Sequence, residues 1–281
     1  MYRKKMSGSA FRKASHKAVT LLGMSGSGKT MLASKLPRHN WFHYSGDYRI
    51  GTRYMGEPIL DNVKREAMKV PFLADLLRSD SIYLCHNITI NNLAPLATFL
   101  GMIGNPSLGG LSVAEFKRRQ SLHRDAEIAA MMDVREFIGK AQETYGYPNF
   151  INDAGGSLCE LDEPSVLRQL AEDTLILYLK PPEAMLAKII ERSLLDPKPM
   201  YYQSSFLDRV LPEYLAEKGL NSADEIVPND FFCWIFPRLV EHRLPRYQTI
   251  ADEYGVVLEA DRIDGIRGEA DFIELICEAL G

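Results

Sequence analysis

Two things that the sequence has little of, cysteine and long apolar runs, narrow the kinds of protein it can encode. Four cysteines, Cys85, Cys159, Cys233 and Cys277, lie far apart without a C-x-x-C pair. This spacing argues against a disulfide framework and against a zinc site. The longest apolar run, residues 93–103, contains proline and glycine and is too short to cross a bilayer. The sequence therefore predicts a cytoplasmic protein with reduced thiols and no membrane partner.

The chain also lacks a strong excess of charge of either sign. Its 33 Lys and Arg residues and 37 Asp and Glu residues give a formal net charge of −4 over 281 residues. Nothing in this total favours nucleic acid as a partner. The basic residues are nevertheless concentrated at the start, where residues 1–16 contain no acidic side chain. We expect this segment to be a disordered basic tail, with a targeting peptide or a true start at Met6 as alternatives.

What the sequence does contain is a phosphate-binding loop of the form G-x-x-x-x-G-K-[ST] at residues 23–30. An apolar run precedes it and residues with high helix propensity follow it, which is the strand, loop and helix order that phosphate binding requires. The alternative is a glycine-rich turn that caps an ordinary helix. The residues expected to bind a nucleotide are Gly23, Ser25, Gly26, Ser27, Gly28, Lys29 and Thr30.

Strand and helix signals alternate through most of the chain. Five short apolar or aromatic runs read as strands, at residues 18–22, 41–44, 149–153, 174–179 and 255–260. Such a βαβ series predicts an α/β protein in which a five-stranded parallel sheet is flanked by helices in three layers. Residues 17–281 are expected to form this single domain.

The second predicted strand ends at Ser45 and is followed by Asp47, Arg49 and Arg53. Ligands of parallel α/β sheets bind at the carboxyl ends of strands, so these side chains are candidates for binding a second substrate. A carboxylate there can accept a hydroxyl proton, and arginines can bind an anion. The alternative is a helix cap at Asp47 with two solvated arginines.

Residues 56–146 interrupt the alternation and read as a mainly helical insertion. Two short helices at 61–70 and 72–78, a strand at 81–85 and a long helix from 112 to 145 are expected there. The basic first half of the long helix reads as a solvated face or as a wall of the substrate site.

The third strand ends in Asp153, which is the form of a Walker B element. Its carboxylate and the Thr30 hydroxyl are the predicted ligands of Mg²⁺. Gly155 and Gly156 follow, where a substrate anion could approach backbone N–H groups; a tight turn is the alternative. A proline-rich segment near 196–202 is expected to be mobile, and residues 192–227 are the predicted lid region.

The residues near the C-terminus resemble the shikimate kinase and nucleoside-monophosphate kinase branch of P-loop kinases. Arg243-Leu244-Pro245-Arg246-Tyr247, followed by Ala251-Asp252, is similar to the R-x-P-x-Y-x-x-x-A-D motif of shikimate kinases. The resemblance implies that Arg243 binds a substrate carboxylate, that Asp47 contacts the accepting hydroxyl and that Arg192 belongs to the lid. It also implies a substrate role for Gly155 and Gly156. It does not extend over 56–146, where Arg65 competes with Arg49 and Arg53 for the place of the substrate arginine, and Lys198 stands where an arginine is usual.

Together these features predict an ATP- and Mg²⁺-dependent phosphotransferase that moves the γ-phosphate to a hydroxyl of a small, anionic metabolite. Lys29, Asp47 and Arg192 are its predicted catalytic residues. The alternative is a P-loop NTPase with a regulatory or conformational role, in which the insertion binds a protein partner. The sequence indicates neither the acceptor's identity, nor ATP over GTP, nor an oligomeric state.

Overall fold

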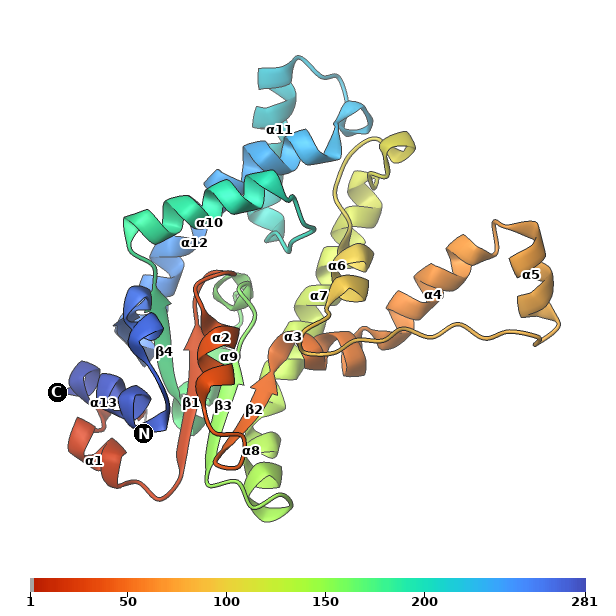
Figure 1. Ribbon diagram of the computed structural model, residues 1–281. Helices are drawn as coiled ribbons and strands as arrows, with labels where there is room; N and C mark the ends of the chain where they lie inside the picture. The colour runs from red at the N-terminus through yellow and green to blue at the C-terminus, as the bar shows by residue number, and fades with distance from the viewer. Residues whose placement is uncertain (1–2) are drawn as a thin grey trace.

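A computed structural model of the chain describes residues 3–281 and is built around one parallel sheet (Figure 1). Its strand order is β2-β3-β1-β4-β5, so the strand that leads into the phosphate loop lies in the middle. The strands are β1 Lys17–Leu22, β2 Trp41–Ser45, β3 Asn149–Asp153, β4 Leu175–Lys180 and β5 Gly255–Glu259. Every predicted strand of the sheet is therefore confirmed within one or two residues.

Side chains alternate between the two faces of this sheet, and both faces are buried. In β4, Leu175, Leu177 and Leu179 pack into one hydrophobic core, whereas Ile176 and Tyr178 pack into the other. Burial on both faces is the reason that β4 reads as a continuous apolar run rather than an alternating one.

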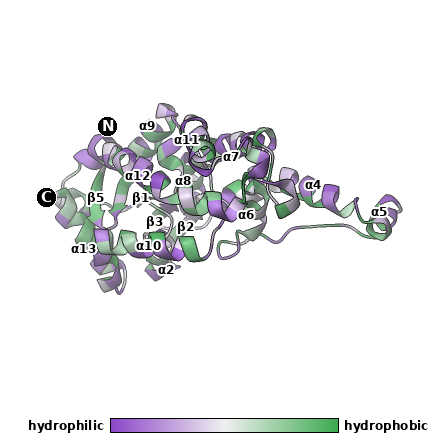
Figure 2. Cartoon of the chain, turned by 90° about the horizontal axis from the view of Figure 1, so that it is seen from above, coloured by the Kyte–Doolittle hydropathy of each residue, from purple (hydrophilic) through white to green (hydrophobic). Residues whose placement is uncertain are grey.

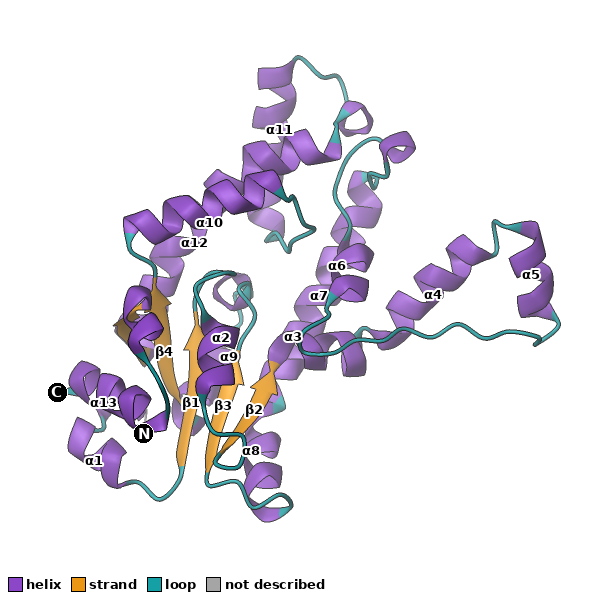
Figure 3. Ribbon diagram, viewed as in Figure 1, coloured by secondary structure: helices purple, strands orange, loops and turns teal. Residues whose placement is uncertain are grey.

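Helices cover both faces and complete three layers (Figure 3). One face packs against α1 (Gly8–Lys13), α2 (Lys29–Lys35) and α13 (Glu269–Leu280). The other packs against α7 (Val113–Met132), α8 (Val134–Glu143), α9 (Pro164–Asp173) and α12 (Pro228–Tyr254). The predicted α/β class with a five-stranded parallel sheet is confirmed.

The predicted disordered tail is wrong for most of its length. Ser7 caps α1, whose Phe11 is buried in the core that α13 shares, while Arg12 and Lys13 face outward. A single buried aromatic residue anchors the segment despite its basic composition. Met1 and Tyr2, which the same prediction covers, lie outside the described residues.

The segment 56–146 divides into two parts with different surroundings. Helices α4 (Gly56–Ala67) and α5 (Pro71–Arg78) form an arm that projects from the body (Figures 1 and 2). Residues 81–85 form no strand, because no other strand lies beside the arm to pair with them. In contrast, α7 and α8 pack on the sheet and form the crossover between the adjacent parallel strands β2 and β3. The predicted single helix over 112–145 is interrupted at Asp133.

Three further helices complete the site region: α3 (Gly46–Arg49), α6 (Ala94–Leu100) and α10 (Glu183–Leu195). A π-helical turn at Ile50–Tyr54 follows α3. In the predicted lid region, α11 (Ser204–Lys218) packs against α12 in a third hydrophobic cluster. Helix α12 is continuous through Pro237 and Pro245, so it is not split. Within residues 3–281, no helix has both the length and the apolar character needed to span a membrane.

Candidate functional site

The glycine loop joins β1 to α2 at the carboxyl edge of the sheet. Gly26 and Gly28 have φ angles of +86° and +94°, which residues with a side chain rarely adopt. Gly28 immediately precedes the first residue of α2, Lys29. The loop thus places backbone N–H groups and a helix N-terminus around one point, the arrangement that binds phosphate in other proteins.

Two polar side chains of the loop are buried. Lys29 Nζ donates hydrogen bonds to the carbonyl oxygens of Gly23, at 2.7 Å, and Met24, at 3.0 Å. Burial lowers the pKa of Lys29, although Asp153 and Asp47 oppose this shift. Ser27 Oγ is buried without a hydrogen-bond partner in the described chain. A buried polar atom without a partner is costly, so a phosphate oxygen would fit this cradle.

Thr30 and Asp153 meet because β1 and β3 are neighbours in register, with Leu21 beside Asp153. Thr30 Oγ1 donates a hydrogen bond of 2.6 Å to Asp153 Oδ2, and His43 Nε2 lies 3.8 Å from the same oxygen. Burial by itself raises the pKa of Asp153, but His43, Lys29 and Thr30 together hold it below its usual range. An ionised carboxylate beside a hydroxyl is a donor set that suits Mg²⁺.

Asp47 stands in the first turn of α3, across the sheet edge from the loop. The N-cap of this helix is Ser45, whose hydroxyl accepts from the Tyr48 N–H, so the alternative of Asp47 as the cap is wrong. Burial and the nearby Asp153 raise the pKa of Asp47 to about 6, against the influence of Lys29. Such a carboxylate can accept a proton near neutral pH.

Gly155 lies against the carboxyl groups of both Asp47 and Glu127. A methyl group on Gly155 would lie 3.1 Å from Asp47 Oδ1 and 2.7 Å from Glu127 Oε1. Any residue with a side chain would therefore displace one of the two carboxyl groups. The glycine keeps both beside the start of the loop that follows β3.

Two cavities meet at this edge of the sheet. The first, of about 520 Å³, is lined by the phosphate loop, Asp153, Met185, Lys188 and Asp264. The second, of about 610 Å³, extends from the loop between α6, α10 and α12. Five residues line both cavities: Ser25, Gly26, Asp47, Gly156 and Arg192. We call the first the loop cavity and the second the adjoining cavity.

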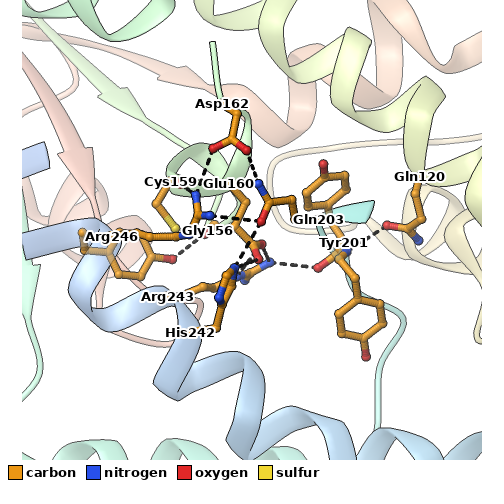
Figure 4. A network of polar contacts seen from close by, with 12 residues as sticks. Gln120, Gly156, Cys159, Glu160, Asp162, Tyr201, Gln203, His242, Arg243 and Arg246 are labelled. Atoms are coloured by element: carbon orange, nitrogen blue, oxygen red, sulfur yellow. Dashed lines mark hydrogen bonds and ion pairs between the residues drawn. The ribbon is translucent and has the colours of Figure 1, made fainter. Parts of the chain in front are cut away.

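Arg243 is a buried residue in the wall of the adjoining cavity. Figure 4 shows its polar contacts. Its Nε donates to Glu160 Oε2 at 2.8 Å, and its Nη2 donates to the Tyr201 carbonyl oxygen at 2.9 Å. Both charged side chains are at least 98% buried. The third nitrogen, Nη1, makes no hydrogen bond within residues 3–281 and lies on the Gly156 side.

Arg192, at the C-terminal end of α10, lies over the phosphate loop. A side chain on Gly26 would collide with its guanidinium, and the residue lines both cavities. No ion pair joins Arg192 to another residue of the described chain. The structure thus brings Lys29, Asp47, Asp153, Gly156 and Arg192 together at one edge of the sheet.

Two predicted substrate residues lie elsewhere. Arg49 forms an ion pair of 2.7 Å with Asp133 and stacks over Phe137, with 4.9 Å between the guanidinium carbon and the ring centre. Arg53 is exposed on the π-helical turn, and neither arginine lines either cavity. The proximity of these residues to Asp47 in sequence was misleading, because Arg49 pairs with Asp133 of the α7–α8 junction and Arg53 lies on the following π-helical turn. Lys198 does line the adjoining cavity, where it pairs with Asp196 at 2.8 Å.

The sequence-based reasoning missed polar residues of α7 that the fold brings to the same place. Glu127 is fully buried and accepts a hydrogen bond from Ser157, while His123 lines the adjoining cavity and stacks on Tyr201. Burial raises the pKa of Glu127 to about 8 and lowers that of His123 to about 4, so both side chains are neutral near pH 7. The sequence does contain a signal for these two residues. His123 and Glu127 lie at helical spacing from Phe116 and Ala130, so all four share the buried face of α7.

Comparisons with known proteins give little help at this site. No protein-family model and no curated protein matches the chain. One similar solved structure is a shikimate kinase from Bacteroides thetaiotaomicron, at 16% sequence identity. The match covers 80% of this chain and 98% of that chain, with a TM-score of 0.32.

Proposed function

We propose that the protein is an ATP- and Mg²⁺-dependent phosphotransferase that moves the γ-phosphate of ATP to a hydroxyl of a small, anionic metabolite. The observation that carries this proposal is the junction of the two cavities at Asp47, Gly156 and Arg192. Phosphoryl transfer needs donor and acceptor to meet in line, and it depends mainly on positioning and charge neutralisation. The two cavities share the carboxylate of Asp47 and the guanidinium of Arg192, so they offer both requirements at one point.

On the donor side, the loop cavity would bind the triphosphate. The loop N–H groups, Ser27 Oγ and Lys29 would bind phosphate oxygens, and Thr30 and Asp153 would hold Mg²⁺, which neutralises phosphate charge when bound. Arg192 has no ion-pair partner in the described chain and would contact the transferring group.

On the acceptor side, Asp47 would orient the hydroxyl and accept its proton. Its pKa, raised to about 6, leaves it ionised at neutral pH yet basic enough to take part in proton transfer. Arg243 Nη1 and the Gly156 backbone would bind the anionic end of the acceptor. The motif around Arg243 supports a kinase of the shikimate kinase-like branch. The proposed compartment is the cytoplasm, which the four free cysteines support.

A P-loop NTPase with a regulatory role is the second candidate. The observation that favours it is the projecting arm of α4 and α5, which exposes the apolar side chains of Phe72 and Leu76 and lines neither cavity. In that case the arm would bind a protein partner, and hydrolysis would drive a conformational change.

Consumption of ATP separates the two candidates. The protein should be assayed with Mg²⁺ and ATP against a library of sugar acids, hydroxy acids, polyols and nucleosides. Stimulation by one chemical class supports the phosphotransferase, whereas uniform basal hydrolysis supports the NTPase. Lys29→Ala should abolish ATP binding in either case, and unchanged affinity would reject the nucleotide site itself.

A further inference from the structure

The adjoining cavity is lined by charged residues at the phosphate loop and at the Asp196–Lys198 pair, and by apolar residues on α6 and α12. Phe232, Phe236 and Arg243 all line it, at spacings of four and seven residues that place them on one helix face. At 1.5 Å per residue, Phe232 and Arg243 are separated by roughly 16 Å along the helix axis. Asp47, Ser157 and Arg243 line the cavity near the phosphate loop.

Helix α6 supplies a second apolar wall. Leu93, Leu96, Ala97 and Leu100 line the cavity, and their spacing is that of a single helical face. This helix belongs to the part of the sequence that the shikimate kinase resemblance does not reach. On α12, Phe232 and Phe236 stack with 5.4 Å between ring centres, and both rings are almost wholly buried where they line the cavity.

From these two walls we propose that the acceptor is an amphipathic alcohol. Its hydroxyl would lie beside Asp47, and its apolar body, aromatic or branched aliphatic, would extend between α6 and α12. This inference rests on the proposed phosphotransferase function and adds the class of acceptor to it. A compact polyol would gain nothing from contact with the apolar side chains of α6 and α12.

A series of 2-hydroxy acids with a constant head group tests the proposal by binding rather than by turnover. Glycolate, lactate, 2-hydroxyhexanoate and 3-phenyllactate would be titrated calorimetrically in the presence of Mg²⁺ and a non-hydrolysable ATP analogue. Affinity should rise about fourfold for each added methylene group that the cavity buries. The proposal would be overturned if affinity did not depend on the size of the apolar group, or if the polyhydroxy acid gluconate bound more tightly.

A matched pair of variants tests whether the apolar part of the ligand binds against α6. Ala97→Trp fills the cavity from α6, and Ala94→Trp adds the same ring on an exposed position of the same helix outside this cavity. We expect Ala97→Trp to weaken binding of 3-phenyllactate at least tenfold, with unchanged affinity for the ATP analogue. Ala94→Trp should bind both ligands like the wild type. Equal effects of the two variants would show that the apolar body does not lie against α6.

A second variant keeps the test valid if Ala97→Trp fails to fold. Leu93→Gln makes the half-buried edge of the wall polar with little change of volume. It should flatten the dependence of affinity on chain length, and an unchanged slope would contradict the proposal. The binding series also stands apart from the reaction: if long hydroxy acids bind tightly but receive no phosphate, the phosphotransferase function fails while the amphipathic cavity remains.

Discussion

Arg243 of α12 and Glu160, in the loop region after β3, form an ion pair in which Nε lies 2.8 Å from Oε2 and both side chains are almost wholly buried. The pair joins α12 to the turn Leu158–Glu160 that follows Gly156, a residue that lines both cavities. Arg243 also donates a hydrogen bond to the Tyr201 carbonyl oxygen. Arg243 is therefore held in place before any ligand binds. Its role in the site depends on Glu160.

The first prediction concerns the stability that this pair provides. Glu160→Gln leaves a buried guanidinium without its counter-charge and should lower the free energy of unfolding by about 3–5 kcal/mol. The matched control is Glu274→Gln, which breaks the exposed pair with Arg12 and should change the free energy of unfolding far less. Urea unfolding measures both values. Similar small losses in the two variants would show that Arg243 finds another partner.

The second prediction is a pH profile set by Asp47. Its carboxylate must be ionised to accept a proton, and its pKa is raised to about 6. Acceptor-dependent turnover should therefore rise with pH through about pH 6 and fall below it as Asp47 takes up a proton. Asp47→Asn should lower turnover by roughly 10²–10⁴-fold while ATP binding persists. Full acceptor-dependent turnover in Asp47→Asn would remove this residue from the reaction.

A third prediction follows from Glu127, whose pKa rises from 4.5 to about 8, chiefly through burial and then through the nearby Asp47 and Glu160. Ser157 and Arg243 oppose the shift. Because the folded state binds the proton more tightly, its stabilising contribution is complete below about pH 4.5 and is lost as pH rises toward 8. The loss is at most roughly 5 kcal/mol.

Glu127→Gln keeps the shape of the side chain and removes this titration. The melting temperature of the wild type should fall between pH 5 and pH 8, and that of Glu127→Gln should fall less. Glu136→Gln, on the exposed side of α8, is the control and should follow the wild type. Parallel curves for all three proteins would show that Glu127 does not titrate between pH 5 and pH 8, contrary to this prediction.

The fourth prediction tests the folded N-terminal segment. Phe11 is 97% buried beside α13, so Phe11→Ala should lower the free energy of unfolding by about 3–5 kcal/mol. Arg12→Ala, one residue away and exposed, should leave it nearly unchanged. A harmless Phe11→Ala substitution would mean that the segment is not part of the core.

The sheet was predictable because its strands carry strong local signals. Burial on both faces makes β4 a continuous apolar run. The loop is recognisable because its glycines and Lys29, which backbone geometry and charge require, all lie within eight consecutive residues. The fold of 8–13 was not predictable from composition. Residues 1–16 carry five Lys and Arg side chains, and the core partners that bury Phe11 lie in α13, at the other end of the chain.

The acceptor side was predicted only in part, since its walls come from distant segments. Asp47 and Gly156 follow strands whose ends meet, so strand position was enough to bring them together. The direction in which Arg49 points depends on Asp133, which lies 84 residues away in sequence. The walls of α6 and α12 likewise meet only through the tertiary fold, and no local pattern indicates that they share a cavity.

The central claim is that the two cavities bring a nucleotide phosphate and an alcohol together, and the fate of the phosphate tests it most directly. The protein would be incubated with Mg²⁺, ATP and 3-phenyllactate, and the products followed by ³¹P nuclear magnetic resonance. The account predicts a phosphate ester of the hydroxy acid that forms as ADP forms and that is lost in Asp47→Asn. ATP consumption that yields only inorganic phosphate, with this acid and across the hydroxy acid series, would contradict it.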